Sequence, residues 1–297
     1  MFERIARSWE LVQASARVLS NDKELLVLPL ISGICSMVVA AAFIAPAYFA
    51  GWFAELQQQA SAGADPETLM TPGMYAMFFA FYMVQYFVII FFNTALVGAA
   101  LLRLNGHNPT LGDAMTIAMA RIGQIAGYAV ISATVGVVLR MIGERLGFVG
   151  RIIEGVIGVA WTVSTFLVVP IIAAKGANPV IAIKDSAYLL RKTWGENIMG
   201  NAGISIAMSF IMMPIIMIGA FSAAYLGDKP ETFLLGIVVG AFTFIVVIGL
   251  SIYGAALSGV YAAAVYMYAE GGSQMRGFDR NLLESAFAPK QKKGLLG

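Results

Sequence analysis

Charged side chains are scarce in this sequence. Of 297 residues, only 12% are Asp, Glu, Lys or Arg, whereas a soluble globular protein carries about 25%. Because a water-facing surface must be wetted, so few charges cannot cover the chain, and lipid must cover the rest. The net charge of +2 is too small to indicate nucleic acid binding, and no nucleic-acid motif accompanies it.

Cysteine and histidine each occur once, as Cys35 and His107. A single cysteine excludes an intrachain disulfide, and one cysteine with one histidine is too few for a zinc site. The sequence also has no Gly-x-Ser-x-Gly motif, no second histidine for a catalytic triad and no Gly-x-x-x-x-Gly-Lys loop. We therefore expect no metal, no cofactor and no enzymatic activity.

Long hydrophobic runs take up most of the chain, and 59% of its residues are hydrophobic. A helix needs about 20 apolar residues to cross the hydrocarbon core of a bilayer. The runs therefore predict an all-α membrane protein, a polytopic bundle with six transmembrane helices. We place these helices at residues 25–53, 74–104, 123–146, 152–174, 198–226 and 233–269. The second and sixth exceed what a bilayer requires, so we expect them to tilt or to project into the cytoplasm.

Basic residues gather on one side of these spans. Of the 19 Lys and Arg residues, 15 fall on the side of the two termini and four on the other. Because Lys and Arg mark the cytoplasmic side, both termini are predicted to be cytoplasmic. We expect nine basic residues to lie at the membrane surface, where they attract anionic lipid: Arg4, Arg7, Arg17, Lys184, Arg191, Lys192, Lys290, Lys292 and Lys293.

Two of the predicted cytoplasmic connections share a turn sequence. Gly106-His107-Asn108-Pro109 is matched 70 residues later by Gly176-Ala177-Asn178-Pro179. Glycine is favoured where a helix ends, and proline where the next helix begins. An amphipathic stretch follows each turn, with apolar stripes at the same spacing: Leu111, Met115, Ala118 and Ile122 in the first, and Ile183, Ala187, Leu190 and Trp194 in the second.

The N-terminal segment carries a comparable stripe between residues 2 and 19. The chain is therefore predicted to hold a pseudo-threefold internal repeat within one transmembrane domain, residues 1–270. Each unit, about 1–106, 107–176 and 177–271, is a cytoplasmic amphipathic helix followed by a hairpin of two spans. Residues 271–297 form a basic cytoplasmic tail.

The second turn lies within a longer pattern. It comprises Val169-Pro170, the Gly-Ala-Asn-Pro turn, Ala182-Ile183-Lys184-Asp185-Ser186 and Leu190-Arg191-Lys192-Thr193-Trp194-Gly195. This pattern resembles the membrane domain of membrane-anchored glycerophosphodiester phosphodiesterases and of related six-span bacterial proteins of unassigned function. The opening resembles one such family more closely still, at Ser8-Trp9-Glu10-Leu11, Asp22-Lys23-Glu24-Leu25-Leu26 and Pro29-Leu30-Ile31-Ser32-Gly33.

The resemblance covers most of the chain and implies a helical bundle in a bacterial inner membrane. It does not imply an enzyme. The phosphodiesterases carry their catalytic residues in a separate soluble barrel domain, and no segment of this chain could form that barrel.

Five charged residues cluster around the predicted third–fourth connection: Arg140, Glu144, Arg145, Arg151 and Glu154. Arg140 and Glu144 are four residues apart, and Arg151 and Glu154 three, so each pair can form along one helix face. Because ionisable residues at membrane depth tend to be functional, the cluster is a candidate gate or anionic-ligand site. Alternatively, the connection is longer than the spans suggest, and these are interfacial charges that pair in water.

Uncharged polar residues within the other spans are candidates for an interior polar path: Gln85, Asn93, Tyr128, Tyr253 and Tyr261. Alternatively, they form ordinary hydrogen bonds between helices. No Asp, Glu or Lys lies in mid-span, which argues against a proton- or sodium-coupled carrier.

The function that these features favour is a non-enzymatic bundle that binds, organises or moves lipid or another amphipathic molecule. A transporter or channel, in a homo-oligomer or alone, and a membrane scaffold for partner proteins are the alternatives. Membrane lipids are the expected partners and nucleic acid is not. A second copy of the chain or another membrane protein stays open as a further partner.

Overall fold

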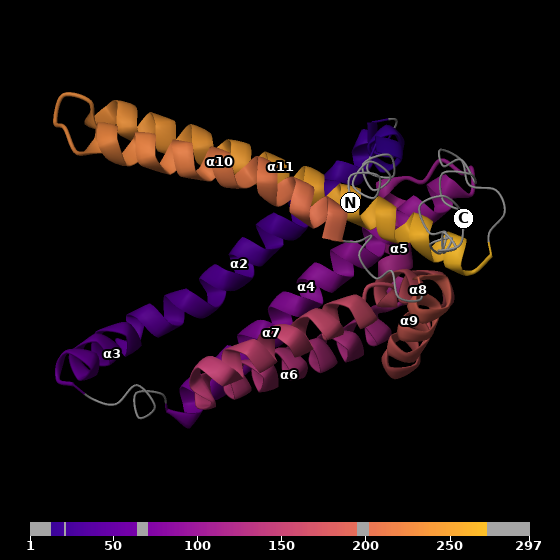
Figure 1. Ribbon diagram of the computed structural model, residues 1–297, viewed down its shortest axis with the longest axis horizontal. Coiled ribbons are helices and arrows are strands. Elements are labelled where there is room, and N and C mark those ends of the chain that lie inside the picture. Colours follow the sequence, from indigo (N-terminus) through magenta and orange to yellow (C-terminus); the bar gives the residue numbers. More distant parts are fainter. Residues whose placement is uncertain (1–12, 21, 64–70, 195–201, 272–297) are drawn as a thin grey trace, which may run out of the picture. The chain divides into compact units, whose positions relative to one another are not determined.

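The computed structural model describes residues 13–20, 22–63, 71–194 and 202–271 (Figure 1). Within these ranges the regular secondary structure is helical, and there is no strand. Residues 13–20 are helical and precede a short 3₁₀ turn, η1. The elements are η1 (Lys23–Leu26), α2 (Val27–Phe49), α3 (Trp52–Ser61), α4 (Pro72–Leu104), α5 (Leu111–Ala120), α6 (Ile122–Arg145), α7 (Gly147–Ser164), α8 (Val168–Lys175), α9 (Pro179–Trp194), α10 (Ala202–Gly227) and α11 (Phe233–Ala269).

Six helical segments in the described ranges are long and apolar enough to cross a membrane. They are Lys23–Phe49, Pro72–Leu104, Ile122–Arg145, Gly147–Lys175, Met208–Gly227 and Phe233–Ala269. The predicted number of spans is therefore confirmed, and the protein is an all-α chain of the multi-span membrane type.

The fourth span differs from its prediction in two ways. It starts at Gly147, five residues before the predicted start, and it is broken between α7 and α8 at residues 165–167. The early start leaves only Leu146 between α6 and α7, and Gly147 turns the chain there with a φ of +57°. The break follows from Pro170, which has no N–H to donate and whose ring crowds the carbonyl four residues earlier.

Both repeated turns end a helix on a glycine in the left-handed region, with φ of +92° at Gly106 and +60° at Gly176. Only glycine adopts this conformation without strain. In the second turn the Asn178 Oδ1 accepts a hydrogen bond of 3.0 Å from the Val180 N–H and so caps the start of α9. The chemistry predicted for these turns is thus present, while the threefold repeat as a whole stays a prediction.

The buried face of α9 is shifted from the predicted stripe. Ala182, Ser186 and Leu190 are buried, whereas Ala187, which was predicted to lie on the apolar face, is exposed. The prediction ranked residues by hydrophobicity, but small Ala and Ser side chains occupy the closest contacts because they let helices approach. The side chain of Trp194 lies outside what the structure describes.

The buried face of α5 is also made of small residues. Ala114 and Ala118 are buried, and Ile122, predicted for this face, is 46% exposed and begins α6. Ile117 fits over Gly98 of α4, where an added Cβ would lie 2.8 Å from its Cγ2. Because Gly98 has no Cβ, Ile117 can pack against its backbone and α5 can lie close to α4.

The described residues belong to two compact units. Unit 1 comprises Met1–Pro29, Ala99–Leu111 and Tyr188–Gly297, and unit 2 comprises Leu30–Gly98 and Gly112–Ala187. Within unit 1 the two long helices α10 and α11 lie side by side as an antiparallel hairpin (Figure 1). In the same unit, α11 also packs against η1.

Glycines bring α10 and α11 close together. An added Cβ on Gly236 would lie 2.6 Å from the backbone nitrogen of Gly227 and 2.8 Å from the carbonyl oxygen of Ala223. Gly219 lies directly against Thr243. Helices in lipid associate by such close packing, since no hydrophobic effect drives them together.

This packing predicts that Gly236→Ala destabilises the protein by about 1–3 kcal/mol, because the new methyl group meets backbone that cannot move aside. The matched control is Gly249→Ala in the same helix, where nothing lies within 4 Å of the added Cβ. The measurement is the midpoint of thermal unfolding in detergent. Equal midpoints for the two variants would show that this hairpin contact is absent.

Candidate functional site

The break between α7 and α8 interrupts the helical backbone of the fourth span, in unit 2. At the break, the Leu167 N–H donates a hydrogen bond of 3.0 Å to the Ser186 Oγ of α9 instead of to a helical carbonyl. Ser186 and Leu167 are both fully buried. Since no water can satisfy a backbone group in lipid, the Ser186 hydroxyl replaces the lost helical acceptor.

Uncharged hydroxyl groups surround this break. The Thr165 Oγ1 donates to the Trp161 carbonyl at 2.8 Å, and the buried Tyr128 of α6 lies close to the Thr165 and Ser132 side chains. The Tyr86 hydroxyl of α4 lies 3.6 Å from the position that a Cβ would take on Gly136. Of the predicted interior polar residues, the structure thus places Tyr128 in a polar cluster.

The turn before α9 is held from the start of α6. The Gln124 Nε2 donates a hydrogen bond of 3.4 Å to the Gly176 carbonyl, and the Arg121 guanidinium lies directly over Gly176. One turn further along α6, Gly127 receives Pro179, whose Cγ would lie 3.0 Å from an added Cβ. These contacts and the Leu167–Ser186 hydrogen bond hold the second turn and α9 against neighbouring helices. The residues of the sequence pattern around this turn therefore include those that make these contacts.

Removing the hydroxyl of Ser186 should leave the Leu167 N–H buried without a partner. We expect Ser186→Ala to destabilise the protein by about 1–3 kcal/mol. The control is Ser251→Ala, the same chemical change at an exposed residue whose hydroxyl bonds only to the Val247 carbonyl of its own helix. Thermal unfolding in detergent compares the two, and a Ser186→Ala variant as stable as the control would contradict the role of this hydroxyl.

The α6–α7 turn carries the charged cluster, and we call residues 140–154 the hairpin tip. The Arg140 Nε donates to the Glu144 Oε1 at 2.8 Å, with the two side chains 64% and 62% exposed. The Arg140 Nη1 also lies 3.4 Å from the Tyr82 hydroxyl of α4, to which it donates. The pair expected from the spacing of Arg140 and Glu144 is therefore formed, at a solvent-accessible position.

The second expected pair, Arg151 with Glu154, is not formed in the described part of the chain, where the ion pairs do not include it. Glu154 is half-buried, and its carboxylate lies directly over Gly143 of α6. The missing Cβ of Gly143 leaves room for that side chain across the hairpin. Spacing along one helix could not reveal a neighbour on the other helix.

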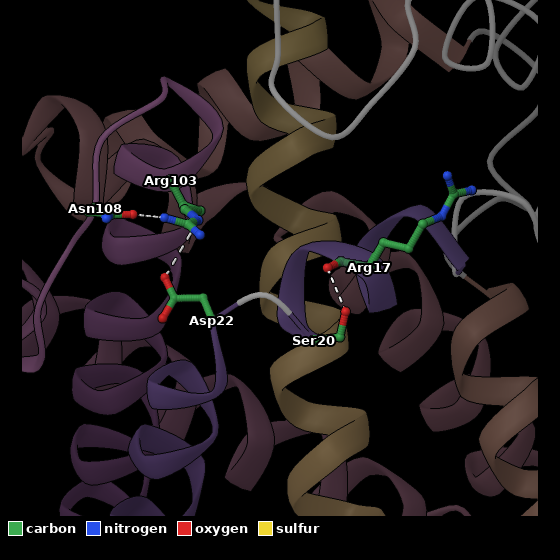
Figure 2. A network of polar contacts seen from close by, with 5 residues as sticks. All are labelled: Arg17, Ser20, Asp22, Arg103 and Asn108. Atoms are coloured by element: carbon green, nitrogen blue, oxygen red, sulfur yellow. Dashed lines mark hydrogen bonds and ion pairs between the residues drawn. The ribbon is translucent and has the colours of Figure 1, made fainter.

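A second polar network lies in unit 1, where Figure 2 shows Arg103 between two partners. Its Nε lies 3.7 Å from the Asp22 Oδ2, with the side chains 26% and 11% exposed. Its Nη1 donates to the Asn108 Oδ1. Arg103 thus links Asp22, which precedes η1, to the first of the two repeated turns, Gly-His-Asn-Pro. The local sequence gives no sign of this contact, because Asp22 and Arg103 are 81 residues apart.

The remaining predicted polar residues are dispersed. Gln85 and Asn93 are half-buried in α4, and the Gln85 Oε1 is buried without a hydrogen-bond partner. In α11, Tyr261 is only 2% exposed, while Tyr253 is 38% exposed. Gln85 and Asn93 belong to unit 2 with Tyr128, and Tyr253 and Tyr261 belong to unit 1.

The predicted surface cations are exposed wherever the structure describes their side chains, at Arg17, Lys184 and Arg191. Lys192 belongs to α9, but its side chain is not described. The other five lie outside the described residues: Arg4, Arg7, Lys290, Lys292 and Lys293. Among the residues that are described, no three His, Cys, Asp or Glu side chains gather as metal ligands would.

Comparison with known proteins identifies a family. Residues 73–277 match the family described as "Family of unknown function (DUF6159)". The matched region covers the spans from α4 to α11, the α7–α8 break and the hairpin tip. No curated protein matches the chain. Since the match covers more than half of its residues, this multi-span membrane protein belongs to the DUF6159 family.

Proposed function

We propose that the protein is a non-enzymatic helical bundle of the bacterial inner membrane that binds, organises or moves lipid or another amphipathic molecule. The observation that carries the proposal is the division of its polar groups. Among the described residues of unit 2, the polar side chains of the buried core carry hydroxyl groups, the half-buried Gln85 is an uncharged amide, and the charged side chains of the tip are mostly exposed. An interior without a buried charge suits an uncharged or amphipathic ligand, because an ion requires a charged or strongly polar site.

Exposed apolar faces support a lipid-facing role. On α7, Val156 and Val159 are 65% and 66% exposed, and on α10 Phe210 and Phe221 are 77% and 75% exposed. Side chains of this size are covered in a stable protein by lipid or by another chain. A ligand that already lies in the bilayer can reach such faces directly.

The length of α4 relates these features to a bilayer. Tyr82, the partner of Arg140, and Arg103, the partner of Asp22, are separated by 21 residues of one helix. At about 1.5 Å per residue they are about 31 Å apart, which matches the hydrocarbon thickness of about 30 Å. We place Arg140 and Arg103 at the two interfaces, with the hairpin tip outside and both termini inside, as the distribution of Lys and Arg requires.

The architecture that we propose for this bundle is three hairpins, each preceded by a cytoplasmic amphipathic helix. It is supported by the order of α5 before α6 and α7, and of α9 before α10 and α11. We retain the relation to the membrane domain of the phosphodiesterases as part of this proposal, because Pro170, Ala182 and Ser186, which carry it, form the α7–α8 corner.

A transporter is the second candidate, and the broken α7–α8 span favours it. Discontinuous helices line substrate sites in many carriers, where unwound backbone faces the ligand. Here the Leu167 N–H is satisfied by Ser186, so substrate would bind to the side chains around the break rather than to that backbone group.

Native mass spectrometry of the protein released from detergent tests the lipid proposal. We expect retained phospholipid at defined stoichiometry, since apolar faces of this size hold acyl chains. In parallel, liposomes containing the protein should move a headgroup-labelled lipid between leaflets or leave it bound, without passing small solutes. Solute flux without retained lipid would favour the transporter, and the absence of both would leave a scaffold for partner proteins.

A further inference from the structure

At the hairpin tip, some of the charged side chains are neutralised and others are not. Arg140 and Glu144 neutralise each other, and Arg140 also donates to the Tyr82 hydroxyl. Arg145 and Arg151 are exposed, and the ion pairs of the described residues include neither. The tip therefore presents two guanidinium groups available to an anion.

These two arginines lie on either side of a tight turn. Arg145 ends α6, Arg151 is the fifth residue of α7, and only Leu146 lies between the helices. Gly147, with its φ of +57°, and Gly150, where an added Cβ would lie 2.7 Å from the Leu146 Cβ, permit this close reversal. Both cations are thus held at the same end of one hairpin.

Apolar side chains accompany the arginines. Phe148 is 79% exposed, and Leu146, Val149 and Ile152 are 55%, 60% and 52% exposed. A turn that lay in water would not gain from presenting these groups, because each costs free energy in proportion to its exposed area. Arginines beside aromatic and aliphatic side chains suit the headgroup level of a membrane. There the guanidinium groups stay in water while the apolar side chains contact the acyl chains.

We propose that the hairpin tip binds the phosphate group of an anionic glycerophospholipid through Arg145 and Arg151, while Leu146, Phe148 and Val149 contact its acyl chains. Guanidinium groups bind phosphate oxygens through paired, charge-assisted hydrogen bonds. The charge of the tip fits this ligand, because its three arginines outnumber its two glutamates, and Arg140 and Glu144 neutralise each other. This inference rests on the proposed lipid function and identifies the site and lipid class.

The test uses the full-length protein in detergent, titrated with phosphatidylglycerol or phosphatidylcholine and followed by native mass spectrometry. The double variant Arg145→Gln/Arg151→Gln should bind phosphatidylglycerol at least about tenfold more weakly, with phosphatidylcholine unchanged. The matched control is Lys229→Gln, which removes one positive charge at the exposed α10–α11 turn and should leave both affinities unchanged.

A conservative variant separates charge from geometry. Arg145→Lys/Arg151→Lys keeps the charge but loses the paired hydrogen bonds, so it should recover part of the phosphatidylglycerol affinity. If the glutamine variant binds phosphatidylglycerol as the unaltered protein does, the tip is not the site, although the lipid function stands. If the unaltered protein binds neither lipid, the proposed function fails, and this inference with it.

Discussion

A membrane provides no water to satisfy the backbone, and the structure of this protein depends on that constraint. Each long apolar run forms a helix because only a helix satisfies its own N–H and C=O groups. The fourth span cannot do so throughout, since Pro170 interrupts it. The chain restores the lost hydrogen bond from α9, where the Ser186 hydroxyl accepts from the Leu167 N–H. Ala182 and Ser186 are small and fully buried, so α9 can approach closely enough to supply it.

The same low polarity determines where charges lie and how the helices pack. Tyr82, which bonds to Arg140, and Arg103, which pairs with Asp22, are separated by 21 residues of the single helix α4, which at about 1.5 Å per residue is close to the thickness of the hydrocarbon. Between these levels, no hydrophobic effect drives the helices together, and close packing at glycines stabilises their contacts instead. In unit 1 Gly219 and Gly236 bring α10 and α11 together, and in unit 2 Gly98 and Gly127 admit Ile117 and Pro179. Polar and small residues thus permit the close helix contacts, and many large apolar side chains, such as Phe210 and Phe221 of α10, stay exposed.

Much of this fold is predictable from local pattern. The six spans follow from run length, and the glycines at 106 and 176 do take the left-handed conformation that ends a helix. What local pattern could not supply are contacts between helices. The spacing of Arg151 and Glu154 predicted an ion pair, but the Glu154 carboxylate lies over Gly143 on the neighbouring helix instead. Ser186 was part of a recognised pattern, yet its partner lies 19 residues away at a break. Pro170 could have indicated that break. Because it lies near the end of an apolar run, run length alone predicted an unbroken span there.

The central claim is that the apolar helices lie in lipid with the hairpin tip outside and α9 inside. Single cysteines in a Cys35→Ser background, treated on intact cells with a membrane-impermeant maleimide, test it most directly. Exposed positions 57 in α3, 145 at the tip, 156 in α7 and 184 in α9 report the four environments. The account predicts labelling of cysteines at 57 and 145 from outside, at 184 only after permeabilisation, and at 156 in neither case. Labelling at 156, or at 184 in intact cells, would contradict it.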